Sequence, residues 1–466
     1  MIDVVVIGGG MAGLAAADRL AATGAQVTLV EAADRLGGNV YTTSFAGHPL
    51  DLGAEALVRR DKTAIELCGE LGLADELVIP ASRRAFVSTA RGLRPLPSGA
   101  IGRMPGGLAE LLGSCLLSPR GLARCGWDLI APSREPDHDV AIGELVRSRL
   151  GHEVLERIVD PLLGSVHAGQ CDTLSARALA PQLVAALGTG KGIVRGLRSA
   201  GPPPDGPAFA TLRTGLGSLV AALADRAKAR GVTVRLGAAA TEVDAPRAGR
   251  VSVLRRGGET LDASACVIAA PAAAAASMVA RAAPAAASDL IRIVHARAAV
   301  VALAYPAEAL AELPAGTGFV SAGGGRLVRA CTWSSSKWDH LRGDPAIVKA
   351  FVGRAGAPPP DVGDLELAAA VHRELDAVLG LRHAPVEQRV HRFDAAIPQY
   401  SVGHLDRVGR IEAALPAHVV VAGGSYRGAG ISACLRSGRA AADHVLRQLG
   451  VNADHHAVDL PAKSLG

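Results

Sequence analysis

The first thirty residues contain the pattern that most constrains the fold. An apolar run over residues 2–7 leads into glycines at positions 8, 10 and 13, and a helical stretch over residues 14–23 follows. A second apolar run, over residues 26–31, ends in Glu31, which lies 18 positions (31 − 13) after Gly13. A dinucleotide-binding βαβ unit typically has this order: a strand, a glycine turn, a helix and a second strand that ends in an acidic residue. The usual spacing between the last glycine and that acidic residue is roughly 20 residues, close to the one found here.

Each glycine of this turn has a separate physical task. Gly8 allows the tight turn, Gly10 lets the backbone approach a pyrophosphate, and Gly13 lets the helix pack closely on the strand. The helix that follows offers its amino-terminal N–H groups to phosphate oxygens. An ordinary βαβ unit with a chance glycine cluster is the alternative, because the chain contains 55 glycines.

Composition limits the class of protein further. The 466 residues suffice for two or three domains, and 49% of them are apolar. The net charge of +5 fits a solvated surface or a site for an anionic substrate, and no dense basic run suggests nucleic-acid binding. The seven cysteines show no CxxC spacing, no metal-ligand pattern is present, and neither a secretory leader nor an apolar membrane span is recognisable. We therefore expect a cytoplasmic protein with reduced thiols.

Periodicity divides the rest of the chain. Spacing near 3.6 predicts helices over residues 108–117, 141–150, 152–163 and 176–187, so residues 80–200 are expected to be mostly helical. A helix is expected from about residue 211 to 230, and others over 361–380 and 431–449. Strands are expected over 232–236, 240–243, 265–269, 291–305, 318–321, 328–332, 346–352 and 418–421.

The residues after Glu31 resemble a known group of flavoproteins. Residues 32–40 place Arg35 and the pair Gly37-Gly38 directly after the acidic strand end, and residues 51–55 read DLGAE. These segments are similar to the FAD-binding segments of the amine oxidase superfamily, whereas NAD dehydrogenases do not normally continue in this way. Later segments resemble the protoporphyrinogen and coproporphyrinogen III oxidases, above all their actinobacterial coproporphyrinogen III oxidases. They are residues 159–169, 333–338, 351–354, 397–404 and 422–431.

The resemblance implies a fold and a domain plan. The fold would be α/β, with a Rossmann-like FAD-binding domain, a mixed-sheet substrate domain and a helical insertion. The FAD-binding domain would comprise residues 1–75, 206–280 and 410–450. The helical domain would cover residues 80–205, the substrate domain 281–409 and a flexible tail 451–466.

The resemblance also implies a set of FAD contacts, with the cofactor held non-covalently. Two positions depart from the family pattern: Asn39 stands where Lys or Arg is common, and Phe393 stands where Trp is usual. The implied contacts are Gly8, Gly9, Gly10, Met11, Ala12, Gly13, Glu31, Ala32, Arg35, Gly37, Gly38, Asn39, Gly53, Ala54, Glu55, Val243, Phe393, Gly430, Ile431 and Ser432.

The substrate contacts implied by the resemblance are fewer. Arg84, or alternatively Arg83, would hold a propionate of a porphyrinogen, since a guanidinium matches a carboxylate with two parallel hydrogen bonds. Tyr400 would line the pocket, although a buried structural tyrosine is the alternative. Coproporphyrinogen carries four propionates and protoporphyrinogen two, so Arg177 and Arg354 are further candidates. No catalytic residue beyond the flavin is implied.

The implied reaction is the six-electron oxidation of coproporphyrinogen III to coproporphyrin III in haem biosynthesis. Hydride would pass to flavin N5 in each of three cycles, and dioxygen would be reduced to hydrogen peroxide. A coproporphyrin ferrochelatase is the implied partner, and residues 101–130 are expected to form either a channel wall or a weak membrane-surface face. Three alternatives remain open: a protoporphyrinogen IX oxidase, a flavin oxidase of an amine or secondary metabolite, and a non-catalytic binding protein such as a GDP dissociation inhibitor.

Overall fold

The computed structural model describes residues 2–97, 115–199, 206–247, 250–323 and 325–451. The chain forms two compact units. Unit 1 comprises residues 1–38, 218–292 and 408–466, and unit 2 comprises residues 39–217 and 293–407. This division differs from the expected domain plan, because residues 39–75 and 206–217 belong to unit 2 and the helical segment shares a unit with the large sheet. The expected tail falls, apart from Val451, outside the described residues.

Unit 1 is built on a parallel sheet with the strand order β10-β2-β1-β14-β20. These strands are β1 (Asp3–Ile7), β2 (Gln26–Val30), β10 (Thr233–Arg235), β14 (Ala265–Ile268) and β20 (Val419–Val421). Residues 4–7 of β1 are at most 3% exposed. A parallel strand buried on both faces needs a continuous apolar run, so the unbroken valines at the start of the chain form the centre of this sheet.

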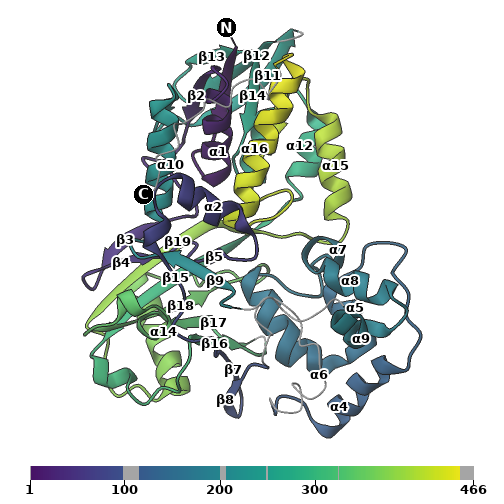
Figure 1. The fold of residues 1–466 in the computed structure, drawn as a ribbon, viewed down its shortest axis with the longest axis vertical. Helices are drawn as coiled ribbons and strands as arrows, with labels where there is room; N and C mark the ends of the chain where they lie inside the picture. Colours follow the sequence, from purple (N-terminus) through teal and green to yellow (C-terminus); the bar gives the residue numbers. More distant parts are fainter. Residues whose placement is uncertain (1, 98–114, 200–205, 248–249, 324, 452–466) are drawn as a thin grey trace, which may run out of the picture. The chain divides into compact units, whose positions relative to one another are not determined.

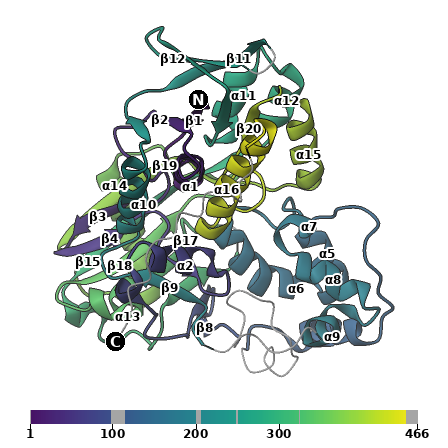
Figure 2. The ribbon, with the colours of Figure 1, turned by 45° about the horizontal axis from the view of Figure 1, so that its top comes forward.

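Two long helices lie side by side in unit 1, as both ribbon views show (Figures 1 and 2). They are α1 (Met11–Ala21) and α16 (Ile431–Gln448). A Cβ added to Gly438 would lie 2.0 Å from the carbonyl oxygen of Ala12, so only glycine permits this close approach. The remaining elements are α10 (Gly217–Ala229), α11 (Ala272–Val279), α12 (Pro284–Leu290), α15 (His404–Ala414) and a three-stranded antiparallel sheet of β11 (Ala240–Arg247), β12 (Arg250–Arg255) and β13 (Thr260–Ala263).

Unit 2 contains a seven-stranded mixed sheet with the order β19-β15-β18-β17-β16-β7-β8. Its strands are β7 (Phe86–Thr89), β8 (Gly92–Pro95), β15 (His295–Tyr305), β16 (Gly318–Ser321), β17 (Val328–Trp333), β18 (Ala346–Val352) and β19 (Glu387–Pro398). The pair β16–β7 is parallel and the other pairs are antiparallel. Helix α14 (Asp364–Leu379) packs Leu367, Val371 and Leu375 into a core with residues of β15, β17 and β18.

A second core explains why residues 39–75 belong to unit 2. The hairpin of β3 (Thr42–Phe45) and β4 (His48–Asp51) contributes Phe45 and Leu50, which pack against Val300 and Ile347 of the large sheet. The smaller elements nearby are β5 (Leu57–Val58), α2 (Lys62–Glu70), η1 (Ala74–Glu76), β6 (Leu77–Val78), β9 (Phe209–Leu212), η4 (Ala307–Leu310), α13 (Ser334–Lys337) and η5 (Asp339–Leu341).

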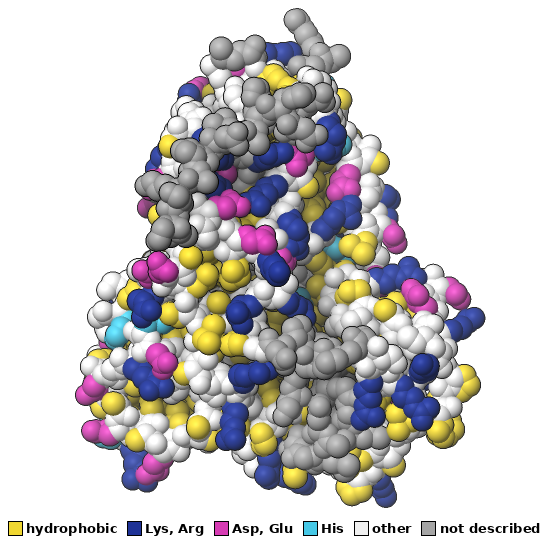
Figure 3. All heavy atoms as spheres, viewed as in Figure 1, with side chains coloured by type: hydrophobic (Ala, Val, Ile, Leu, Met, Phe, Trp, Pro, Cys, Tyr) yellow, Lys and Arg dark blue, Asp and Glu magenta, His cyan; other side chains and the backbone are white. Residues whose placement is uncertain are grey.

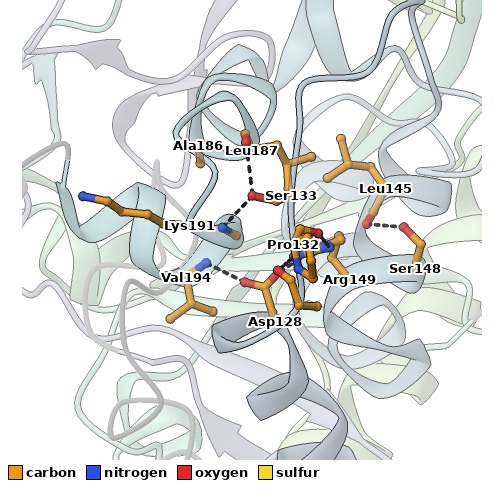
Figure 4. A network of polar contacts seen from close by, with 12 residues as sticks. Asp128, Pro132, Ser133, Leu145, Ser148, Arg149, Ala186, Leu187, Lys191 and Val194 are labelled. Atoms are coloured by element: carbon orange, nitrogen blue, oxygen red, sulfur yellow. Dashed lines mark hydrogen bonds and ion pairs between the residues drawn. The ribbon is translucent and has the colours of Figure 1, made fainter.

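The helical part of unit 2 has its own core of buried aliphatic side chains. It comprises α4 (Pro119–Gly126), η2 (Trp127–Leu129), α5 (Ile142–Leu150), α6 (His152–Val154), the π-helical η3 (Leu155–Gly164), α7 (Ala176–Leu179), α8 (Pro181–Gly188) and α9 (Gly192–Ser199). An ion pair organises it: buried Asp128 accepts hydrogen bonds from Arg149 Nε at 2.8 Å and from the Val194 amide at 2.9 Å (Figure 4). The wide turn of η3 contains Pro161, which an ordinary helix interior accommodates poorly.

The fold departs from the sequence expectations at several places, and the expected strands did not include β3 to β6, β12 or β13. Residues 86–95 form a strand pair within the segment 80–200 that was expected to be mostly helical, and residues 209–212 form β9, which pairs with both β5 and β6, so α10 begins only at Gly217. Strand β19 was not expected at all. It lies at the edge of its sheet, half of its residues are polar and most are half-buried, so it lacks the apolar run or clean alternation that marks a strand. The helix expected over residues 108–117 lies mainly outside the described residues.

The described helices include none with both the length and the apolar composition that a membrane crossing requires. On the face drawn in Figure 3, lysine and arginine side chains are scattered among acidic and apolar ones. Of the segment 101–130, residues 101–114 fall outside the described part, while Trp127 and Ile130 are 56% and 72% exposed.

Candidate functional site

The glycine turn of unit 1 forms an open cradle at the start of α1. Gly8 has a φ of +105° and a Cβ there would lie 2.6 Å from the carbonyl oxygen of Ala269, while a Cβ on Gly13 would lie 1.8 Å from the carbonyl oxygen of Gly8. Gly10 differs, because a Cβ there would meet no protein atom within 4 Å. Glycine is therefore required at positions 8 and 13 to avoid clashes with the backbone of the protein. The space beside Gly10 is open and can accommodate part of a ligand.

Gly10 precedes helix α1 and provides no side-chain cap. The first N–H groups of a helix have no partner within it, and with the helix dipole they attract anions. The first turn, Met11 to Gly13, and the empty side of Gly10 together fit a phosphate group. Helix α16 starts in the same manner: Gly430 precedes it without a side-chain cap, and a Cβ on Gly430 would meet no atom within 4 Å.

Glu31 is held beside the glycine turn by two backbone groups. Its Oε2 accepts a hydrogen bond from the Gly9 amide at 2.6 Å, and its Oε1 accepts one from the Ala33 amide at 2.8 Å. Each carboxylate oxygen retains a further lone pair for a hydroxyl donor. Glu31 is thus oriented at the end of β2, where a carboxylate can receive the hydroxyls of a ribose.

The loop after Glu31 folds back onto the glycine turn. The Gly37 amide donates to the Gly9 carbonyl at 2.8 Å, and Gly10 and Gly37 form a β-bridge. The Arg35 guanidinium donates to the Leu36 and Gly38 carbonyls at 3.2 and 2.8 Å, which fixes the turn. Unit 1 therefore brings together Gly8 to Gly13, Glu31, Arg35, Gly37 and Gly38. It also contains Ala32, which is exposed, Ile431 and Ser432 on the first turn of α16, and Val243, whose side chain is buried in β11.

The other implied cofactor residues lie in unit 2. The Ala54 amide donates to the Asn39 carbonyl at 3.0 Å, and a Cβ on Gly53 would lie 2.0 Å from that same oxygen. The Asn39 side-chain amide donates to the Ala395 and Ala396 carbonyls of β19 at 3.1 and 2.6 Å. Asn39 therefore ties the loop to β19, the strand that also carries Phe393, whose ring meets His391 edge to face at 4.4 Å.

Glu55 is the centre of a buried charge cluster that sequence reasoning missed. Its carboxylate forms ion pairs with Lys337 and Lys349, and Lys349 Nζ also donates to the Asp51 carbonyl at 2.6 Å. Burial alone would raise the pKa of Glu55, but the two lysines lower it to about 2. A single lysine inside the apolar run of β18 was the signal that a buried partner exists.

The two implied substrate residues lie far apart in the sheet order. Arg84 is exposed and precedes β7, and its carbonyl accepts hydrogen bonds from the Thr317 amide and hydroxyl at 2.8 and 3.0 Å. Tyr400 follows β19, is 2% exposed and stacks on His404 with ring centroids 3.9 Å apart. Strands β15, β18, β17 and β16 separate β19 from β7. Arg83 is also exposed, and Arg177 donates to the Pro136 carbonyl at 2.9 Å.

A loop of unit 2 binds the segment that contains Tyr400. The Ser175 amide donates to the Tyr400 carbonyl at 2.7 Å, and Gln399 Nε2 donates to the His167 carbonyl at 2.9 Å. Burial lowers the pKa of His167 to about 4, so this imidazole is uncharged at neutral pH. His167 therefore adds no positive charge to a site for an anionic substrate.

The residues of unit 1 fit a dinucleotide cofactor. The cradle beside Gly10, the uncapped start of α1 and the oriented carboxylate of Glu31 match a pyrophosphate followed by a ribose. Among the described residues, no group of three or more His, Cys, Asp or Glu side chains is arranged to hold a metal ion.

Comparison with known proteins agrees with this geometry. The family model of flavin containing amine oxidoreductases matches residues 11–446. The chain is 32% identical to the coproporphyrinogen III oxidase of Bacillus subtilis, over 96% of this chain and 98% of that protein. It is 36% identical to the coproporphyrinogen III oxidase of Mycobacterium leprae, over 93% and 96% of the two chains.

Solved structures give the same result. A crystal structure from Exiguobacterium, described as a candidate protoporphyrinogen oxidase, is 28% identical with a TM-score of 0.85 and covers 96% of this chain and 99% of that one. Cyclohexylamine oxidase from Brevibacterium oxydans has a TM-score of 0.70 at 19% identity, which shows a shared fold alone. The expected α/β flavoprotein fold and the resemblance to the porphyrinogen oxidases are confirmed. The chain belongs to the flavin-containing amine oxidoreductase family and is a flavin-dependent oxidoreductase.

Proposed function

We propose that this protein oxidises coproporphyrinogen III to coproporphyrin III, with FAD bound non-covalently and dioxygen as electron acceptor. The observation that carries the proposal is the near-full-length similarity to proteins of that name in several bacteria, at 32–36% identity. The cradle of unit 1 supports a dinucleotide cofactor, and the family match specifies a flavin.

Bound flavin would supply the electron acceptor for each two-electron step. The chain itself would hold the cofactor through Gly10, the first turn of α1 and Glu31, with Asn39, Glu55, Val243 and Phe393 as further contacts carried over from the resemblance. Its substrate contacts would come from Arg84 and Tyr400. No side chain is assigned as a catalytic base, and His167, whose pKa burial lowers to about 4, would contribute no positive charge to the binding of an anion.

A cytoplasmic location is part of the proposal, since all seven cysteines are free of disulfides. The product of the proposed reaction would pass to an iron-inserting enzyme, the coproporphyrin ferrochelatase implied by the resemblance. Peripheral membrane contact through residues 101–130 stays a prediction.

The test is oxygen consumption by the purified yellow protein with coproporphyrinogen III and protoporphyrinogen IX offered separately, while porphyrin fluorescence is recorded. Faster turnover of coproporphyrinogen III supports the proposal. Preference for protoporphyrinogen IX favours the second candidate, which the 30% identity to human protoporphyrinogen oxidase makes specific. Turnover of amines with inactivity on both porphyrinogens would refute both. Release of all flavin by acid precipitation tests non-covalent attachment.

A further inference from the structure

A hydrogen-bonded contact within unit 2 joins two segments that lie next to places where the chain passes from one unit to the other. The chain makes these passages after residues 38, 217, 292 and 407. The hairpin of β3 and β4 begins shortly after the first passage, and the turn over residues 213–217 ends at the second. We call the contact between this hairpin and this turn the Asp51 latch.

The hydrogen bonds of the Asp51 latch come from Asp51 and Thr42, which face each other across the hairpin. The Thr42 hydroxyl donates to Asp51 Oδ1. The Leu216 amide donates to the two carboxylate oxygens of Asp51 at 3.0 and 3.2 Å. The Gly217 amide donates to Thr42 Oγ1 at 2.7 Å. Both amides lie at the start of α10, where N–H groups have no partner within the helix, so the hairpin supplies their acceptors.

The turn packs tightly on the hairpin and buries the carboxylate. Gly215 has a φ of +81°, and a Cβ there would lie 2.4 Å from Cγ2 of Thr42. Asp51 is 7% exposed and Leu216, which covers it, is 0% exposed. A small cavity of about 250 Å³, counting its opening to solvent, is lined by Asp51, Gly215 and His340 and gives protons access to the carboxylate. Release of the turn would return Asp51 to water.

Charged groups face Asp51 from several elements, but the two nearby lysines form their ion pairs with Glu55. Lys349 Nζ donates to the backbone carbonyl of Asp51 rather than to its carboxylate. Burial lowers the pKa of His340, so this imidazole is uncharged at neutral pH. The charged and titratable groups around the latch are Lys349 of β18, Lys337 of α13, Glu55, and His340 of η5 with its neighbours His48, Arg213 and Asp339.

Burial has the largest influence on Asp51 and raises the pKa of its carboxyl to about 6 from 3.8. The hydrogen bonds from Thr42 and Leu216 and the charge of Lys349 lower it by less. A carboxyl whose pKa is raised by burial binds its proton more tightly when it is covered than when it is in water. The covered state is therefore favoured at acidic pH, and its advantage is lost as the pH rises through about 6.

We propose that the Asp51 latch is a pH-sensitive conformational device, in which neutral Asp51 keeps the turn over residues 213–217 closed on the hairpin and ionised Asp51 favours its release. Release would free the amides of Leu216 and Gly217 and detach the start of α10 from the hairpin. A purely structural cap would hold the turn equally tightly over the same pH range. The proposal concerns the protein chain alone and does not depend on the substrate.

The experiment is hydrogen exchange of the purified full-length protein, read by mass spectrometry on peptides that contain Leu216 and Gly217. Protection factors are compared, because they remove the pH dependence of the exchange chemistry itself. With pKa values of 3.8 for the released and about 6 for the closed carboxyl, we expect protection to fall about tenfold between pH 5 and pH 7. The Val194 amide is the internal control, because it donates at 2.9 Å to Asp128, a buried aspartate that is paired with Arg149.

Variants assign the effect to the Asp51 charge. Asp51→Asn keeps an acceptor for the Leu216 amide but cannot ionise, so its protection should change by less than about twofold over the same range. Asp61→Asn is the matched control and should behave as the wild type, because Asp61 caps α2 by accepting from the Thr63 amide at 3.4 Å. Thr42→Val removes the acceptor of the Gly217 amide and should lower its protection at both pH values.

Three outcomes overturn the inference. The first is a protection factor for the two latch amides that does not change with pH in the wild type. The second is the same pH dependence in Asp51→Asn as in the wild type. The third is an equal fall at Val194, which would show that the whole of unit 2 loosens together. The wild-type pH series needs no variant, so it decides the matter even where a variant does not fold.

Discussion

The substitution Gly10→Ala is expected to weaken cofactor binding without lowering the stability of the folded protein. A Cβ at Gly10 would meet no protein atom within 4 Å, and Gly10 has φ −74° and ψ −179°, which alanine adopts readily. The apoprotein should therefore keep its stability, or gain about 0.4–1 kcal/mol because alanine restricts the unfolded chain. The same methyl group would occupy the space into which a pyrophosphate must fit.

The expected loss is one of affinity. We expect FAD to bind at least about tenfold more weakly, which is about 1.4 kcal/mol or more. The assay is thermal unfolding of the apoprotein, followed by titration with FAD monitored through quenching of flavin fluorescence. Gly409→Ala is the matched control, since a Cβ there also meets no atom and the residue lies in α15.

Gly13→Ala completes the series. Its Cβ would lie 1.8 Å from the Gly8 carbonyl oxygen, so this variant should be destabilised even without cofactor. If Gly10→Ala bound FAD with wild-type affinity, the pyrophosphate would not lie beside Gly10 and our placement of the cofactor would be wrong. An apoprotein melting temperature that fell as far for Gly10→Ala as for Gly13→Ala would refute the steric reasoning.

Three further predictions concern the buried charges of unit 2. Glu55→Gln leaves two lysines without their carboxylate, and we expect a loss of about 3 kcal/mol in denaturant unfolding at pH 7; an unchanged midpoint would show that solvent screens the cluster. Burial raises the pKa of Asp51 to about 6 from 3.8, so its contribution to stability is complete below about pH 4 and is lost as the pH rises through 6, at about 3 kcal/mol in all. Unfolding at pH 4.5 and 7.5 should therefore show a smaller decline in Asp51→Asn than in the wild type, and equal declines would contradict the assignment. Asp128→Ala should cost about 3–5 kcal/mol because it leaves Arg149 and the Val194 amide without their acceptor, as a calorimetric melt can establish; a loss below about 1 kcal/mol would show that water replaces the carboxylate.

The parts that the sequence predicted best are the ones whose signal is local. The continuous apolar run of β1 follows from burial on both faces of a parallel sheet, and the glycines of the turn follow from sterics within a few residues. Strands β16 and β18 begin and end where expected. Strand β19 was missed because polar residues make up half of it and interrupt its apolar pattern, and β9 was missed because its short partners β5 and β6 are remote in sequence.

In the candidate site, too, the features encoded by local sequence were predicted and those formed by distant segments were not. The spacing from Gly13 to Glu31 indicated the dinucleotide cradle, since both residues belong to one βαβ unit. The ion pairs of Glu55 with Lys337 and Lys349 join segments almost three hundred residues apart, and no local pattern encodes them. The same holds for Arg354, which follows β18 and lies near Asp160 of η3, 194 positions away in the sequence.

The sequence by itself determined the nucleotide-binding unit, the cofactor class through its resemblance, and the apolar strands of both sheets. Only the tertiary structure decided which charges are buried, which arginines are already paired and which remain available. Burial and pairing depend on contacts between distant segments, and the cost of leaving a charge unpaired arises only once folding has removed it from water. Arg84 was the first candidate in the sequence, with Arg177 and Arg354 as further candidates, and of these three only Arg354 has a buried Nε without a hydrogen-bond partner among the described residues.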